Sequence, residues 1–287
     1  MSVEHDEKGS ICPLYLSILL IFIVVLTGCA TMKPEPQDIP PPDVRSILAT
    51  LKMRYDLVDS MRSWTNVGIE SHGQKEEIRE YLRYQKPDKL RVDAMGPFNA
   101  PRAIALAVEK SFRFYFVAEN EVIMGELSDG VIKVIFDVDL RVSDVRSSIF
   151  ANPFLDGNVN KLEIESYGDE YVIRRASTIP GYREEITILA RNTAVSKWQV
   201  IDSEDEMVQE ISFSRYQEVG GILRPLKAVI HRPFDDTRIS IESVDPEINV
   251  ELTEKAFDLP IPEGTKIVQL SDLKSRQTPD SDAGTDN

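Results

Sequence analysis

The chain has few of the residues on which cross-links and metal sites depend. Its 287 residues include two cysteines, Cys12 and Cys29, and three histidines. Neither His72 nor His231 has a second histidine or a cysteine at metal-ligand spacing, so we expect no metal site. With so few cysteines, stability must come from a buried core, and a chain of this length can form one.

Motifs of the common enzyme classes are also missing. The sequence contains no G-x-S-x-G elbow, no H-E-x-x-H zinc motif, no glycine-rich phosphate loop and no dinucleotide-binding fingerprint. An acidic run of Asp202, Glu204, Asp205 and Glu206 lacks the glycine and the register of a calcium loop, which indicates a solvated connection. We therefore expect no enzymatic activity and no cofactor.

Positive charge is in deficit. The chain has 33 Lys and Arg residues against 48 Asp and Glu residues, which gives a net charge of −15 at pH 7. This acidity argues against binding to nucleic acid or to anionic lipid head groups through bulk charge. We expect no nucleic-acid partner.

Long apolar runs are scarce as well, and the one that exists ends in a cysteine. It covers fifteen mostly apolar residues, Ile11 to Val25, which is short of the roughly 20 that span a bilayer. The residues Leu26-Thr27-Gly28-Cys29 that follow have a branched apolar residue, two small residues and a cysteine, the pattern of a bacterial lipobox. This pattern favours a cleaved signal peptide over an uncleaved membrane anchor. We predict a signal peptide over residues 1–28 and acylation of Cys29, by a diacylglycerol on its thiol and an acyl chain on its amine.

Cleavage before Cys29 leaves a chain of 259 residues with a single cysteine, so no disulfide is possible within it. It also removes one lysine and three acidic residues, which changes the net charge from −15 to −13. Ala30 follows the cysteine, whereas an aspartate there marks retention in the inner membrane of enterobacteria. By that analogy we predict a lipid anchor in the outer membrane, with the protein facing the periplasm.

A proline-rich segment and a helix follow the cysteine. Residues 30–42 read ATMKPEPQDIPPP, with five prolines, which predicts an extended tether over residues 29–42. Asp43 is placed to cap a helix. Apolar residues then recur at helical spacing to about Met61, which predicts one amphipathic helix.

Beyond Ser63 the apolar residues alternate with polar ones, the period of a strand with one face in water. Gly220-Gly221 and Asp235-Asp236 stand where hairpin turns are expected. We predict about a dozen short strands in an antiparallel sheet, sandwich or barrel. A helical insert interrupts them between Gly130 and Ala151, its second helix capped by Ser143. The domain is predicted to cover residues 43–270, and the acidic tail 271–287 to be disordered.

The order of several segments resembles the outer-membrane lipoprotein receptor LolB and the LolA/LolB-like lipoproteins. The segment PDKLRVDAMGPF, residues 87–98, is similar to the third strand and the protruding loop of that family, with Phe98 where the family has an exposed leucine. Residues 64–68 resemble the first strand after the long helix, and residues 134–151 resemble the two inner helices. The ending AFDLPIPEG, residues 256–264, is similar to the close of larger members.

The resemblance implies a mainly β fold, an incomplete antiparallel β-barrel with the helical insert as a lid over an apolar cavity. It also implies binding of lipoprotein acyl chains delivered by a periplasmic LolA-like carrier, and a loop at Phe98 that touches membrane or acyl chain. Two prolines flanking Phe98 also favour a projecting loop. The candidates to line the cavity are Leu90, Val92, Ile104, Leu106, Phe112, Phe114, Phe116, Ile135, Phe136 and Phe150.

Three functions are compatible with this pattern. The first is LolB-like acceptance and insertion of lipoproteins. The second is binding of a lipid or glycolipid without transfer. The third is a structural role in envelope assembly, with the same apolar residues forming an ordinary packed core.

Overall fold

The computed structural model describes residues 42–277, and the first element within them is helix α2, Val44–Asp56. The Asp43 carboxylate accepts a hydrogen bond from the backbone N–H of Arg45 at 3.0 Å. This bond satisfies one of the free amides of the first turn, so the predicted N-cap is confirmed.

The helix ends earlier than predicted, at Asp56 rather than near Met61. The Nζ of Lys86 donates to the carbonyl oxygens of Tyr55 and Asp56, both at 2.8 Å, which satisfies two carbonyls of the last turn. Val58 and Met61 are buried against the sheet in a separate apolar cluster. Their spacing also fits an extended chain, so the apolar pattern that predicted the helix continues past the residue where the helix ends.

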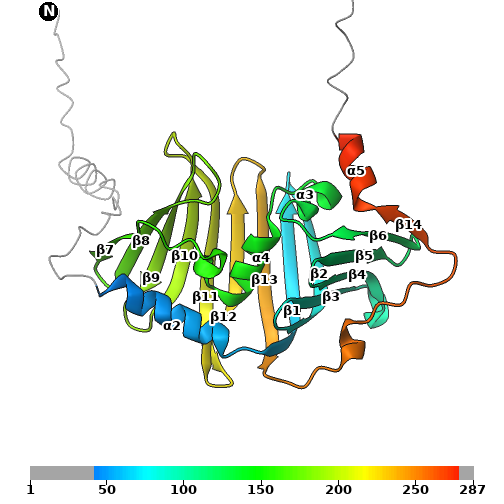
Figure 1. The fold of residues 1–287 in the computed structure, drawn as a ribbon, viewed down its shortest axis with the longest axis horizontal. Helices are drawn as coiled ribbons and strands as arrows, with labels where there is room; N and C mark the ends of the chain where they lie inside the picture. Colours follow the sequence, from blue (N-terminus) through cyan, green and yellow to red (C-terminus); the bar gives the residue numbers. More distant parts are fainter. Residues whose placement is uncertain (1–41, 278–287) are drawn as a thin grey trace, which may run out of the picture. The chain divides into compact units, whose positions relative to one another are not determined.

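Fourteen strands of the described residues form one sheet (Figure 1). They are β1 (Ser60–Ser71), β2 (Gln74–Gln85), β3 (Lys89–Met95), β4 (Pro101–Val108), β5 (Ser111–Phe116), β6 (Glu121–Glu126), β7 (Glu163–Tyr167), β8 (Glu170–Ala176), β9 (Arg183–Leu189), β10 (Ala194–Ile201), β11 (Met207–Val219), β12 (Ile222–Arg232), β13 (Thr237–Ile248) and β14 (Lys266–Gln269). Their order is β14-β6-β5-β4-β3-β2-β1-β13-β12-β11-β10-β9-β8-β7. Strands β7 and β14 are the two ends and do not pair with each other, so the sheet is an incomplete barrel, as predicted.

The sheet consists of two meanders joined in the middle. Strands β1 to β6 form one and β7 to β13 the other, and antiparallel pairing of β1 with β13 unites them, for example Thr65 with Ser243. The only parallel pair among the described strands is β14 with β6. The predicted turns at Gly220-Gly221 and Asp235-Asp236 lie at the two hairpins that flank β12.

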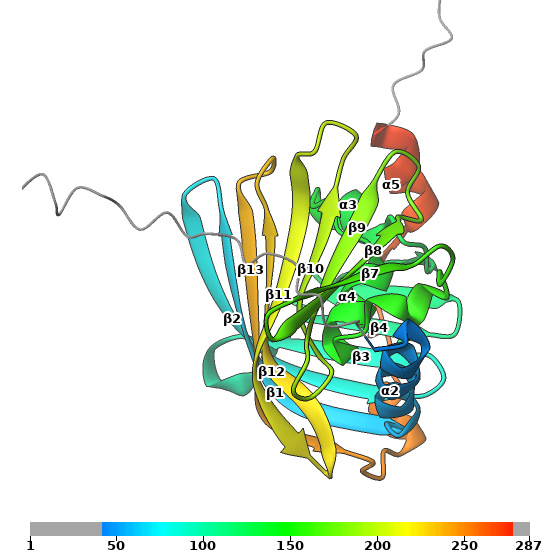
Figure 2. The same cartoon turned by 90° about the vertical axis from the view of Figure 1, so that its left-hand side faces the viewer.

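The predicted helical insert lies between β6 and β7. It contains α3 (Val131–Phe136), α4 (Val142–Phe150) and the short helix η2 (Pro153–Asp156). With α2, these helices occupy the concave side of the curved sheet (Figure 2). The predicted cap Ser143 is wrong, because α4 begins at Val142 and Ser143 lies within its first turn; the residue at the N-cap position is Arg141.

The chain after β13 returns to the far end of the sheet through η3 (Glu254–Phe257) and β14, and it ends in α5 (Leu270–Gln277). This helix lies where the sequence predicted the start of a disordered tail. Leu270 is buried against Gly125, where an added Cβ would stand 2.8 Å from the Leu270 Cβ, and Leu273 packs in the same cluster. Two apolar side chains at helical spacing therefore fix the segment. Residues 278–287 lie outside the described part of the chain.

The largest core cluster lies between α2 and strands β8 to β12, and it contains a fully paired ionic network. The buried Arg175 guanidinium donates to Glu184 at 2.7 Å and to Asp156 at 2.8 Å. The Glu184 carboxylate also accepts from the Trp198 indole at 3.0 Å and from the Ser177 hydroxyl at 2.7 Å. Every charge in this group has an opposite charge beside it.

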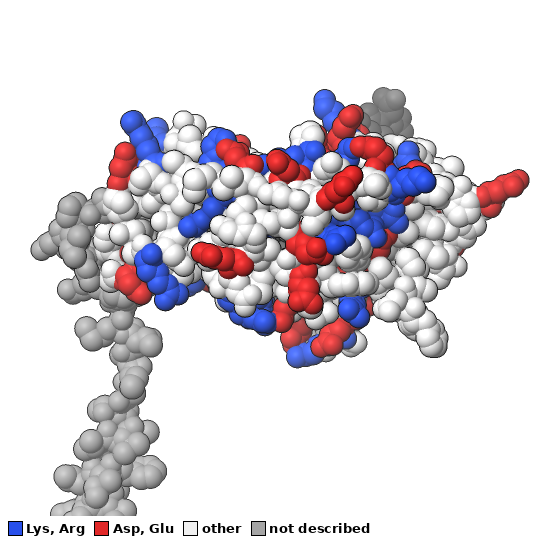
Figure 3. Space-filling model, turned by 90° about the horizontal axis from the view of Figure 1, so that it is seen from below, with Lys and Arg blue, Asp and Glu red and all other residues white. Residues whose placement is uncertain are grey.

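On the surface seen in Figure 3, acidic and basic side chains are interleaved.

Candidate functional site

Three phenylalanines of β5 line the concave side of the N-terminal meander. Phe112, Phe114 and Phe116 point to one face of the strand, with ring centroids of neighbouring pairs 6.4 Å and 4.6 Å apart. They share an apolar cluster with Ile135 of α3. The ring of Phe136, also on α3, stands edge-on to Phe114 at 5.1 Å. The structure thus places these five predicted residues together.

Phe150 and Leu90 lie in a different cluster, around the end of α4. The Phe150 ring contacts Tyr84 at 5.0 Å and Tyr55 at 4.9 Å, both edge-on. Leu90 packs in the same cluster, and Val92 lies on the same face of β3 two residues further on. The predicted cavity residues therefore divide into two groups.

The placement of Ile104 and Leu106 on the cavity is wrong. Both lie on the opposite face of β4, buried against Phe257 and Leu259 of the C-terminal segment. The concave face of β4 is formed instead by alanines, because Ala105 pairs with Val92 on one side and Phe114 on the other. The larger apolar row of this strand is thus covered by a part of the chain about 150 residues away.

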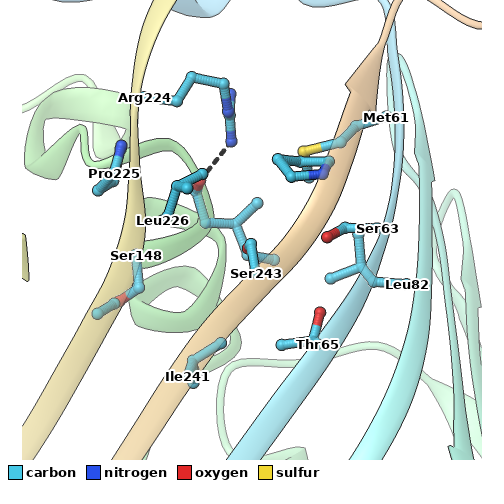
Figure 4. Close-up of a pocket in the computed structure, with 13 residues that line it drawn as sticks. Met61, Ser63, Thr65, Leu82, Ser148, Arg224, Pro225, Leu226, Ile241 and Ser243 are labelled. Carbon is cyan, nitrogen blue, oxygen red and sulfur yellow. Dashed lines mark hydrogen bonds between the residues drawn. The ribbon is translucent and has the colours of Figure 1, made fainter. Parts of the chain in front are cut away.

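A small cavity lies beside α4, where this helix covers strands β1, β12 and β13 (Figure 4). Its volume is about 50 Å³. None of the residues predicted from the sequence lines it. Its lining comprises Met61, Ser63, Thr65, Leu82, Ser148, Ile149, Arg224, Pro225, Leu226, Ala228, Ile241, Ser243 and Pro246.

Arg224 is the one charged residue of that lining, and it is 6% exposed. Its Nη2 donates to the Ile149 carbonyl oxygen at 2.7 Å, and its guanidinium lies 5.3 Å from the centre of the Phe150 ring. Within residues 42–277 it forms no ion pair. Burial lowers the pKa of Arg224 to about 10, so the side chain is a cation at neutral pH.

Sequence reasoning missed Arg224, although a signal existed. The inward row of β12 is apolar at Ile222, Leu226, Ala228 and Ile230, and Arg224 interrupts it. A charge at an inward position of an apolar strand is costly unless something compensates for it.

Glu80 is a second ionisable group on the concave side. It pairs with Thr65 of β1 and with Ala94 of β3, and it makes no hydrogen bond or ion pair within the described residues. Burial raises its pKa to about 7. At neutral pH a substantial fraction of the protein molecules therefore carries a proton on the Glu80 carboxyl.

Phe98 projects from the loop between β3 and β4, as predicted. Its side chain is fully exposed, and its backbone lies in the left-handed region, with φ of 61°. Asn99 follows with φ of 57°. Two successive residues in this region are costly for side chains other than glycine. The loop is closed by hydrogen bonds from the Gly96 N–H to the Ala100 carbonyl at 2.8 Å and from the Ala100 N–H to the Pro97 carbonyl at 3.3 Å.

Two further expectations concern lipid attachment and metals. Cys29, the predicted acylation site, and the signal peptide and tether around it lie outside the described residues. In the described part of the chain, no group of three or more His, Cys, Asp or Glu residues is arranged to hold a metal ion. No helix among residues 42–277 is long and apolar enough to cross a membrane.

The fold is LolA-like, an open antiparallel sheet that curves around helices. No family model and no curated protein matches the sequence. A DUF1329 family protein from Desulfovibrio piger has a similar structure, with a TM-score of 0.57, 16% identity, and coverage of 76% of this chain and 98% of that one. A LolA superfamily protein from Nitrosomonas europaea has a TM-score of 0.53 and 13% identity, covering 76% of this chain and 99% of that one.

A domain from Vibrio parahaemolyticus, described as an outer membrane lipoprotein-sorting protein, is similar as well. Its TM-score is 0.55 at 13% identity, with 75% of this chain and 97% of that chain covered. At these identities the likeness establishes the fold, and it confirms the fold that the sequence resemblance implied.

Proposed function

We propose that this protein is a lipoprotein, anchored in the outer membrane through Cys29, that binds acyl chains on the concave side of its sheet. In this proposal it accepts lipoproteins from a LolA-like carrier and inserts them into the membrane, as LolB does. The LolA-like fold supports a lipid-binding role, and the lipobox supports the anchor. The exposed Phe98 supports the step of delivery.

The observation that carries the binding proposal is the apolar surface beneath α3. The rings of Phe112, Phe114 and Phe116 form a continuous face, and Phe136 on the covering helix is 47% exposed. An acyl chain on this face would exchange contacts with α3 for contacts of the same chemical kind. The helices must move off the sheet for this, because ligand pockets typically need 300–1,000 Å³.

A binding assay tests the first half of the proposal. The purified chain should bind a fluorescent acyl probe at one site, and gentle purification followed by mass spectrometry should recover bound lipid. Phe114→Ala should lower the affinity for the probe. It should also lower the stability, by at most about 3–5 kcal/mol, the cost of truncating a fully packed phenylalanine, because Phe114 is partly buried. A variant that loses stability while neither protein ever binds the probe would favour the third function, an ordinary packed core.

A transfer assay tests the second half. The acceptor is the full acylated protein in outer-membrane vesicles, and the donor is a LolA-like carrier loaded with lipoprotein. Lipoprotein should move into the vesicles. Binding of acyl probe without such movement would support the second function, a lipid-binding lipoprotein that transfers nothing.

Phe98 gives the transfer assay its sharpest variant. The exposed ring gains nothing for the fold, whereas burial of a ring in a membrane contributes on the order of 1.5–3 kcal/mol. Phe98→Glu should leave the melting temperature unchanged and probe binding intact, while delivery fails because a carboxylate resists entry into hydrocarbon. Phe98→Leu should keep delivery.

The chain offers a matched control for Phe98. Phe234, in the turn between β12 and β13, is 69% exposed, and Phe234→Glu should leave delivery unchanged. Equal loss in both variants would show that exposed phenylalanines act without regard to position. Normal delivery by Phe98→Glu would remove the main support for the receptor role.

A further inference from the structure

The cavity beside α4 contains a cation that no carboxylate neutralises. Arg224 uses one donor on the Ile149 carbonyl, and no acidic residue is among the residues that line the cavity. Moving a charge out of water is costly, and in proteins the cost is ordinarily offset by an opposite charge or by several hydrogen bonds. Arg175, in the core cluster of the same sheet, has both.

The rest of the lining is amphiphilic. Thr65 of β1 and Ser243 of β13 are cross-strand partners, and both line the cavity. Neither hydroxyl makes a hydrogen bond within the described residues. The remaining surface is largely apolar, with Met61, Leu82 and Ile241 on the same side as the two hydroxyls. In Figure 4, Arg224 reaches in from β12 and Thr65 from β1, with the strand of Ser243 between them.

We propose that this cavity binds the anionic head group of an acyl lipid, a carboxylate or a phosphate at the end of one hydrocarbon chain. Arg224 is the charged contact, and the Thr65 and Ser243 hydroxyls are the neutral donors. The inference rests on the proposed acyl binding and names the class of lipid bound.

The size of the cavity fits a ligand whose head group lies inside the cavity and whose hydrocarbon chain lies outside it. About 50 Å³ is the space of one or two water molecules, so a head group enters and the hydrocarbon chain does not. The hydrocarbon chain would leave the cavity and lie on the apolar surface between the helical insert and the sheet. A guanidinium donates two parallel hydrogen bonds to a carboxylate or phosphate, a geometry that an ammonium group does not offer.

The net negative charge of the protein does not oppose this binding. Surface charges separated by more than about 8–10 Å of salt solution are largely screened, whereas a buried cation is screened much less. The acidity of the chain therefore disfavours adsorption to anionic membranes and leaves a single enclosed arginine free to bind one anion.

The test compares three probes with the same sixteen-carbon chain at pH 8, by calorimetry on the full chain without its signal peptide. Palmitate and hexadecyl phosphate carry the anion, and hexadecanol does not. Hydrogen bonds between charged groups are stronger than those between neutral groups, so both anions should bind at least tenfold more tightly than hexadecanol. Inorganic phosphate and acetate, offered alone, should not bind at the same concentrations.

Variants of Arg224 link the preference to this cavity. Arg224→Gln should reduce the affinity for palmitate to that for hexadecanol and leave hexadecanol binding unchanged. Arg224→Lys should keep part of the preference. Arg146→Gln, which removes an exposed arginine from α4, the helix beside the cavity, is the control and should behave as wild type.

The outcomes separate this inference from the function on which it rests. Equal affinities for palmitate and hexadecanol, or a preference that survives Arg224→Gln, would overturn the head-group site and leave acyl binding standing. Binding of inorganic phosphate alone, abolished by Arg224→Gln, would show an anion site with no lipid specificity. Absence of binding by all three long-chain probes would overturn acyl binding itself.

Discussion

Arg175 and Arg224 both lie buried on the concave side of one sheet, yet their surroundings differ. Arg175 contacts two carboxylates and the backbone carbonyls of Pro153 and Asn158, and one of these carboxylates binds Trp198 and Ser177 in turn. Arg224 contacts one backbone carbonyl and one aromatic ring. In the first region, which we call balanced, each charge has an opposite charge beside it, whereas the cation of the second region has none within the described residues.

The two regions are therefore suited to different roles. A balanced buried network fixes one arrangement of β8, β9 and η2, because removal of any partner leaves a buried charge without its opposite charge. An unbalanced cation beside a cavity contributes little to such rigidity. It is suited to a ligand, or to a covering helix such as α4 that is held by few polar contacts.

The largest effect is expected from breaking the balanced region. Arg175→Met should destabilise the protein by about 3–5 kcal/mol, because Glu184 then remains buried and charged without its partner. Urea unfolding measures the loss. Arg174→Met on the same strand, where the arginine pairs with partly exposed Glu165 and Glu185, should cost at most about 1 kcal/mol. Similar losses in the two variants would show that burial of Arg175 does not matter.

A smaller, pH-dependent effect is expected at Glu80, the other unpaired ionisable group of the concave side. Burial raises its pKa from 4.5 to about 7, so the folded state binds a proton that the unfolded state releases. Its contribution to stability is full below about pH 4.5 and is lost as the pH rises through 7. Glu80→Gln should therefore stabilise the protein by about 1–2 kcal/mol at pH 8 and hardly at pH 4, given 1.36 kcal/mol per pKa unit and partial exposure.

Unfolding curves of the Glu80 variant at the two pH values check this expectation. Glu77→Gln, at an exposed position of the same strand, is the control and should show no difference between them. A stabilisation of Glu80→Gln that is equal at pH 4 and pH 8 would mean that titration of this carboxyl is not its cause.

The smallest effect is expected from removing the unbalanced cation. Arg224→Met loses the hydrogen bond to the Ile149 carbonyl, worth about 0.5–1.5 kcal/mol, and also removes the cost of a buried charge. The two terms oppose each other, so urea unfolding should give a stability within about 1 kcal/mol of wild type. A loss as large as that of Arg175→Met would erase the contrast between the two regions.

Much of the fold was predictable from local pattern. Alternation identified strands such as β5, where Phe112, Phe114 and Phe116 had to share a face, and the insert between β6 and β7 followed from the change of period. Alternation alone does not tell which of two rows faces inward. Ile104 and Leu106 share one face of β4, as alternation predicts, but this is the outer face, and the segment that buries them there comes from the far end of the chain.

The cavity itself was less predictable. Thr65 and Ser243 come together through the pairing of β1 with β13, and no local pattern specifies the partner of β1. Arg224 alone had a signal, as the one charge in the inward row of its strand.

The union of β1 with β13 also sets an order of events in time. Strand β1 has β2 beside it as soon as that hairpin forms, but its other edge waits for residues about 180 positions later. Until β13 arrives, twelve residues of edge strand stay open to pairing with other chains. Contacts so distant in sequence form slowly, and the delay exposes such an edge to aggregation. We therefore expect a chain that stops at Asp236 to aggregate through β1, measured by light scattering. In the whole protein, β13 then acts as the strand that ends this vulnerable period.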